Sequence, residues 1–193
     1  MNSAEDPVLE ALLEHVSHHG VASASLANLA EATGLSKSGL FARFGSRAAL
    51  HQSVVDGVIN RFLQIVWIPH ADEEPGEDRL RNIISDWTLW VQGKFLSGGC
   101  PISRLISELG NADIDSRHKL VESQNKWLKA IAKEFAAIDE RLRVTDKDDQ
   151  AAFELHCLIV GYGIHYKNFS DQCVTQKLQV AVNRLIRDHH QIL

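Results

Sequence analysis

Apolar side chains recur at every third or fourth position along almost the whole chain, and no stretch alternates apolar and polar residues as a half-buried strand would. This spacing places the apolar residues of each segment on one face of an α-helix. Proline and glycine mark the breaks. Pro7 suits the first turn of a helix, and residues 69–76 form an acidic, polar loop with two prolines. The pattern predicts an all-α protein of about nine helices.

Composition limits the class of protein further. Of the 193 residues, 45% are hydrophobic, so a sizeable core can form. No run of about 18 apolar residues occurs, so we expect no membrane-spanning helix and no membrane partner. The first ten residues, MNSAEDPVLE, are acidic and polar and do not resemble a secretion signal. These features favour a cytoplasmic protein.

The cysteines and histidines suggest neither a disulfide framework nor a metal centre. Cys100, Cys157 and Cys173 are odd in number and widely spaced, and the adjacent histidine pairs at 18–19 and 189–190 point apart on a helix. We expect no metal and no cofactor. Cys100 precedes Pro101 at a predicted helix start, where a thiolate would be favoured. Two interpretations of Cys100 are open: a redox role and ordinary packing.

Residues 25–44 carry the clearest functional pattern. A short helix from Ser25, a break at Gly34 and a second short helix ending near Phe44 match the helix-turn-helix plan. The second helix would expose short polar or basic residues near its start: Ser36, Lys37, Ser38, Gly39 and Arg43. Such a surface can enter the major groove of DNA, while its backbone amides attract phosphate. An ordinary helical hairpin fits the same spacing.

The charge distribution agrees with DNA binding although the net charge is −5. Between Thr33 and Leu50 there are three basic residues, Lys37, Arg43 and Arg47, and no acidic one. The excess carboxylates lie elsewhere in the sequence. A local basic patch on an acidic body suits a protein that touches DNA through one short element.

Residues 20–50 resemble the DNA-binding domain of the TetR family (AcrR-like) of transcriptional regulators in their pattern of small, apolar and glycine positions. Gly99-Cys100-Pro101, the helix with Trp127 and residues 152–156 resemble a TetR-type C-terminal domain. The resemblance implies a DNA-binding domain at 1–50, a connecting helix at about 46–68, and a ligand-binding and dimerisation domain at 51–193. It further implies a homodimeric repressor that leaves a palindromic operator when a small molecule binds.

Carried over by position, the resemblance predicts these DNA-binding residues: Ser25, Ser36, Lys37, Ser38, Gly39, Phe41, Arg43 and Arg47. Lys37, Arg43 and Arg47 would contact phosphate, with guanine recognition as the alternative for Arg43. Ser38 and Gly39 would face base edges. The chain departs from the family at Phe41, where a tyrosine hydroxyl commonly reaches phosphate, and at residues 48–49, which are alanines where acidic residues are usual.

The C-terminal half offers two further predictions. The helix near residues 146–169 is apolar on two faces, which suggests one face toward its own domain and one toward a second subunit. The predicted dimer residues are Phe153, Val160, Ile164, Leu178, Val182 and Leu185. The predicted ligand-pocket residues are Trp87, Trp90, Trp127, His156, Cys157 and Tyr162. The alternative for the dimer residues is that they close a monomeric core. The alternative for the pocket residues is that the aromatic side chains simply pack in the core.

Other function classes have less support in the sequence. The motifs GxSxG, GxGxxG, HExxH and the P-loop are absent, so we expect no enzyme. A helical interaction or small-molecule-binding protein that has lost DNA binding would also explain Phe41 and the negative net charge. The predicted partners are therefore double-stranded operator DNA, a second copy of the chain and an unknown small-molecule effector.

Overall fold

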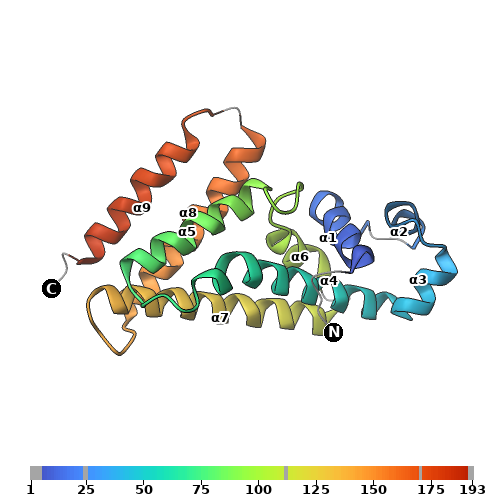
Figure 1. Cartoon of the computed structure of the whole chain (residues 1–193), viewed down its shortest axis with the longest axis horizontal. Helices are drawn as coiled ribbons and strands as arrows, with labels where there is room; N and C mark the ends of the chain where they lie inside the picture. Colours follow the sequence, from blue (N-terminus) through green and yellow to red (C-terminus); the bar gives the residue numbers. More distant parts are fainter. Residues whose placement is uncertain (1–5, 24–25, 111–112, 170, 191–193) are drawn as a thin grey trace. The chain divides into compact units, whose positions relative to one another are not determined.

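A computed structural model describes residues 6–23, 26–110, 113–169 and 171–190, and within these ranges it contains nine α-helices and no strand (Figure 1). The all-α prediction is confirmed. The chain forms two compact units. The first comprises Met1–Leu63 with Gly93–Ser123, and the second comprises Gln64–Gln92 with Gln124–Leu193. None of the described helices combines the length and apolarity that a bilayer crossing requires.

The first unit is built from short helices around a leucine- and valine-rich core. Its helices are α1 (Pro7–His19), α2 (Leu26–Thr33), α3 (Lys37–Phe44), α4 (Arg47–Phe62), α6 (Ile102–Leu109) and the first part of α7 (Ile114–Ile138). Leu12, Leu29, Leu40 and Val54 are almost completely buried. Because α2 and α3 each bury a leucine, the two short helices are held by tertiary packing that their length alone would not provide.

The helix α6 and the turn before it contact the end of α1. The Glu108 carboxylate accepts a hydrogen bond from the Ala22 amide at 3.0 Å, and the Gly98 amide donates to the Ser17 hydroxyl at 3.0 Å. A Cβ atom at position 98 would overlap the Ser17 backbone. These contacts make α6 part of the same compact unit as α1 although about 80 residues separate them.

The α4 helix ends earlier than the predicted connecting helix at 46–68. Regular α-helix stops at Phe62, and the chain continues as a π-helical turn (Leu63–Trp67) and a 3-10 turn (Ile68–His70). Pro69 lacks an amide hydrogen and cannot continue an α-helical ladder, which accounts for a change of helix type ahead of it.

The second unit contains α5 (Glu77–Gln92), the rest of α7, α8 (Asp146–Asn168) and α9 (Val174–His190). In Figure 1, α9 folds back along α8. Two glycines of α8 differ in their surroundings. A Cβ at Gly163 would lie 3.0 Å from Val91 Cβ on α5, so this glycine permits a close approach of two helices within the chain, whereas no described atom of a neighbouring segment lies within 4 Å of a Cβ at Gly161.

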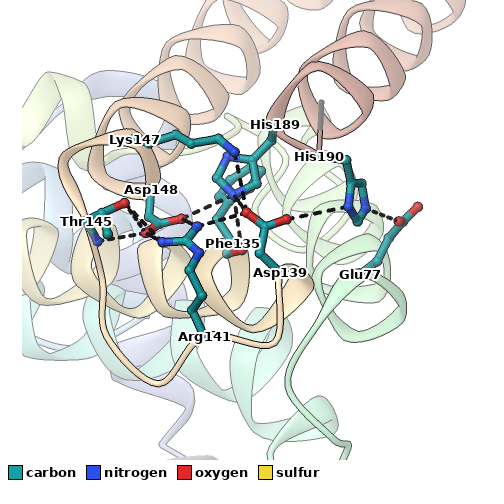
Figure 2. Close-up of polar contacts among 9 residues, drawn as sticks. All are labelled: Glu77, Phe135, Asp139, Arg141, Thr145, Lys147, Asp148, His189 and His190. Atoms are coloured by element: carbon teal, nitrogen blue, oxygen red, sulfur yellow. Dashed lines mark hydrogen bonds and ion pairs between the residues drawn. The ribbon is translucent and has the colours of Figure 1, made fainter. Parts of the chain in front are cut away.

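A buried polar network joins the α7–α8 loop to the end of α9 (Figure 2). Arg141 donates two hydrogen bonds to the Asp148 carboxylate, at 2.6 and 2.8 Å, and the Thr145 amide donates a third at 2.7 Å. His189 Nε2 lies 3.1 Å from Asp148 Oδ1 and 3.2 Å from the Phe135 carbonyl. Burial would raise the pKa of Asp148, but these hydrogen bonds outweigh it and lower that pKa to about 2. The carboxylate is therefore charged at neutral pH.

Candidate nucleic-acid interface

The start of α3 is fixed by its own side chains. Ser36 takes an extended conformation and its hydroxyl accepts a hydrogen bond from the Gly39 amide at 3.0 Å, which satisfies one of the free amides of the first turn. Ser38 lies 3.0 Å from the same hydroxyl. Gly34, in the turn before α3, has φ +69°, a conformation that side-chain-bearing residues rarely adopt. The helix-turn-helix prediction is confirmed in its local geometry.

The outer face of α3 is polar, cationic and exposed. Leu40 is fully buried, whereas Lys37, Ser38 and Arg43 are exposed. Phe41 lies on the outer face with 60% of its surface exposed. Gly39 has no neighbour within 4 Å of a Cβ position except Ser36 Oγ at 3.2 Å, so the outward side of the helix is open there. This face of α3 can therefore approach the major groove of DNA at Gly39 without displacing other side chains.

The guanidinium of Arg43 pairs with a carboxylate from another helix. Its Nη2 donates to Asp6 Oδ2, and its Cζ lies 5.6 Å from the ring centre of Phe44. Asp6 is also the N-cap of α1, where Oδ1 accepts from the Val8 amide at 3.1 Å. An acidic side chain thus partly neutralises one of the predicted DNA-contacting cations in the free protein.

A second cation lies at the beginning of α4. Ser46 caps this helix by accepting from the Ala49 amide at 3.1 Å, and Arg47 follows it, exposed. Arg47 Nε donates to His51 Nε2 at 3.4 Å, and His51 Nδ1 lies 2.8 Å from Asp113 Oδ2. Burial would raise the pKa of Asp113, but hydrogen bonds from the Ser116 amide and His51 lower it. Asp113 is therefore a carboxylate that faces the imidazole.

Of the eight predicted DNA-binding residues, Ser25 lies outside the described residues. The other seven lie at the start and outer face of α3 and at the first position of α4. Three residues adjoining them were not predicted: Asp6, His51 and Asp113. The i, i+4 spacing of Arg47 and His51 was the only sequence signal for any of these contacts. Asp6 and Asp113 approach from 37 and 62 positions away, which no local pattern indicates.

The predicted ligand-pocket residues lie in the second unit, mostly buried. Trp87, Trp90, Trp127 and Tyr162 are each at most 5% exposed. Trp127 contacts Trp87 edge-on with ring centres 5.0 Å apart, and the His156 ring centre lies 5.7 Å from that of Trp87. Burial lowers the pKa of His156.

The structure contains a groove of about 450 Å3 nearby, between α5 and α9. Tyr162 is hydrogen-bonded to two residues of its lining, Gln92 at 2.6 Å and Thr175 at 2.9 Å. None of the six predicted pocket residues lines this groove itself.

The predicted dimer residues divide into two sets. Phe153 and Ile164 on α8 are 55% and 54% exposed, and Val160 and Leu185 are partly exposed. Leu178 and Val182 are buried in the single chain and line the α5–α9 groove. Phe153, Cys157 and Leu185 line a separate groove of about 390 Å3 between α8 and α9.

In the described part of the chain, no three His, Cys, Asp or Glu side chains are grouped as metal ligands.

The helix α3 follows a glycine turn and exposes a cationic face, and most of this all-α chain lies C-terminal to it. These features define a DNA-binding transcriptional regulator of the helix-turn-helix class. Family models agree with this class. Residues 8–54 match the model for bacterial regulatory proteins of the tetR family, and residues 76–182 match a tetracyclin repressor-like C-terminal domain. The chain belongs to the TetR family.

Solved structures share this fold over nearly the whole chain. A TetR transcriptional regulator from Chloroflexus aurantiacus has a TM-score of 0.78 at 18% identity, covering 95% of this chain and 92% of its own. A TetR-family regulator from Streptomyces coelicolor has a TM-score of 0.76 at 16% identity, covering 94% and 93%. The regulator AibR, solved with isovaleryl coenzyme A and operator DNA, has a TM-score of 0.70 at 18% identity, covering 93% and 96%. No curated protein sequence matches the chain.

Proposed function

We propose that this TetR-family regulator binds a palindromic operator as a homodimer and is released from it by a small-molecule effector. The observation that carries the DNA-binding part is the outer face of α3. It offers exposed Lys37, Ser38 and Arg43 and an open backbone at Gly39, while Leu40 on the opposite face is buried. A recognition helix needs this division between a face held by the core and a face free for the groove.

The contacts divide by chemistry. Lys37, Arg43 and Arg47 are assigned to phosphates, because flexible cations gain most from the charged backbone and set the register of the helix. Ser38 and Gly39 are assigned to base edges, because short side chains let the helix approach them. Phe41 cannot donate a hydrogen bond to phosphate. Its exposed ring suits an apolar contact with sugar or a thymine methyl group.

The dimer interface is proposed on the outer face of α8 and α9. Phe153 and Ile164 expose large apolar surface there, and the groove beside Phe153 also contains Glu154 and Arg184. A two-fold interface brings the same surface of each copy together, so Arg184 of one copy can meet Glu154 of the other. The symmetry would present two α3 helices to successive major grooves, about 34–36 Å apart.

The effector site is proposed in the second unit, at the groove between α5 and α9. Its volume lies within the range of small-molecule sites, and hydroxyl and amide groups from Thr88, Gln92 and Thr175 adjoin the apolar Leu89 and Val182. Arg81 is the charged side chain of the lining. This composition favours a neutral or anionic amphiphile over a cation. A co-purified small molecule detected by native mass spectrometry would identify it.

The test of DNA binding is a gel-shift titration with the DNA upstream of the protein's own gene at several salt concentrations. Lys37→Ala and Arg43→Ala should each weaken binding and lower the salt dependence by about one phosphate contact, a slope change of about 0.9. Lys133→Ala, which removes an exposed cation of α7, should leave both unchanged. Unchanged affinity in the two α3 variants, with helicity retained, would contradict the assigned recognition helix.

A further inference from the structure

Arg47 occupies an electrostatically unfavourable position. It is the first residue of α4, where the helix dipole presents its positive end. The first turn of α4 contains no acidic residue, since residues 48 and 49 are alanines. An arginine in this place needs a compensating negative charge from elsewhere in the fold if its side chain is to have a defined orientation.

The compensation comes through a hydrogen-bonded chain of three side chains. An arginine Nε can only donate, so His51 Nε2 must accept its hydrogen bond. The single proton of the neutral imidazole is then on Nδ1, which donates to Asp113 Oδ2 at 2.8 Å. The two contacts thus determine the tautomer of His51 and connect the Arg47 guanidinium to a carboxylate 66 positions further along the chain.

Asp113 is itself held in place. Its Oδ1 accepts from the Ser116 amide at 3.2 Å at the start of α7, and its side chain is only 10% exposed. The His51 side chain is 11% exposed. Two nearly buried groups therefore orient an exposed one, which is the arrangement that holds a binding residue ready for its ligand. Arg47 uses only its Nε in these three-residue contacts, so within the described part of the protein its two terminal nitrogens can face a phosphate.

We propose that His51 and Asp113 are positioning residues that hold Arg47 in the orientation in which it meets a DNA phosphate. This inference rests on the proposed DNA-binding function. Arg47 and Asp113 are the charged groups that contact His51 within the described residues.

The test uses two substitutions at His51 and one matched control. His51→Leu removes both hydrogen bonds and retains an apolar volume. His51→Gln can accept from Arg47 and donate to Asp113, so it can replace both hydrogen bonds. Asp56→Asn is the control, because Asp56 pairs with Lys119 and so joins the same two helices, α4 and α7, without touching Arg47. Circular dichroism verifies the fold of each variant.

Operator affinity is measured for these variants and for Arg47→Ala at pH 8. We expect His51→Leu to lose about fivefold in affinity at pH 8, the equivalent of one hydrogen bond of about 1 kcal/mol. His51→Gln should retain wild-type affinity, because it restores both hydrogen bonds, and Asp56→Asn should match the wild type.

The outcomes separate the inference from the function it rests on. If Arg47→Ala weakens binding but His51→Leu does not, or if His51→Gln binds as weakly as His51→Leu, the positioning role is refuted while DNA binding stands. If Lys37→Ala weakens binding and Arg47→Ala does not, the phosphate contact of Arg47 is refuted, and its positioning with it. If the wild type shows no salt-sensitive DNA binding, the proposed function fails first.

Discussion

The pairing of Asp6 with Arg43 predicts that removing one negative charge will tighten DNA binding. The two oxygens of Asp6 have different partners: Oδ1 caps α1 by accepting from the Val8 and Leu9 amides, and Oδ2 accepts from Arg43. Asparagine caps helices about as well as aspartate, so Asp6→Asn keeps the cap and loses the ion pair. A DNA phosphate then no longer competes with a carboxylate for Arg43.

The size of the effect follows from the exposure of the pair. The Arg43 and Asp6 side chains are 40% and 28% exposed, which places them with surface ion pairs worth about 0.2–1 kcal/mol. Releasing Arg43 should therefore raise operator affinity by a factor of about 1.4 to about 5 at moderate salt, because 1.4 kcal/mol corresponds to tenfold. The gain should shrink as salt screens both interactions.

Fluorescence anisotropy with labelled operator DNA, at three salt concentrations, measures this change. Glu10→Gln is the matched control, because Glu10 on α1 pairs with Arg61 on α4 at 3.6 Å with similar exposure but away from α3. The double variant Asp6→Asn with Arg43→Ala should bind like Arg43→Ala alone, since the effect acts through Arg43. Equal or weaker binding by Asp6→Asn, with unchanged stability, would refute the competition.

Three further predictions concern other parts of the fold. Gly39→Ala should leave the first unit folded, because a gain in helix propensity of about 1 kcal/mol offsets the 3.2 Å contact with Ser36. It should nevertheless weaken operator binding at least about tenfold in the anisotropy assay. Wild-type affinity of this variant would show that DNA does not approach the α3 backbone at Gly39. Asp148→Asn should lower the free energy of unfolding in urea by about 2–3 kcal/mol, because the buried carboxylate accepts two hydrogen bonds from Arg141. Since its folded pKa of about 2 lies below the ordinary 3.8, about 2 kcal/mol of wild-type stability should be complete above about pH 4 and disappear as the pH falls toward 2, and the variant should lack this dependence. Phe153→Asp should give a monomer in analytical ultracentrifugation, and a wild-type protein that is itself monomeric would contradict the proposed interface.

The sequence predicted the parts of the fold that depend on local chemistry. Helical spacing and the break at Gly34 act within a few residues, and the structure confirms them. Periodicity also separated the two faces of α8 correctly. Ile159 lies on the face buried in the chain, and Phe153 lies on the exposed one.

The rest depends on contacts between distant residues. Nothing near Arg43 or His51 in the sequence indicates that Asp6 would pair with Arg43 or that Asp113 would contact His51, because those pairs form only after the helices pack. The ligand pocket shows a different limit. Aromatic spacing predicts that Trp87 is buried, but it contains no information about where a void remains beside it, and the groove opens instead where α5 and α9 do not fill the space between them.

The clustering of the tryptophans has a practical consequence for spectroscopy. All four, at positions 67, 87, 90 and 127, belong to the second unit, and Trp67, Trp87 and Trp127 lie edge to face at 5.0–5.8 Å. Intrinsic indole emission is therefore an optical probe of the second unit alone. A quenching titration would register small molecules that enter that unit, whereas melting of the helix-turn-helix would have to be followed by another chromophore.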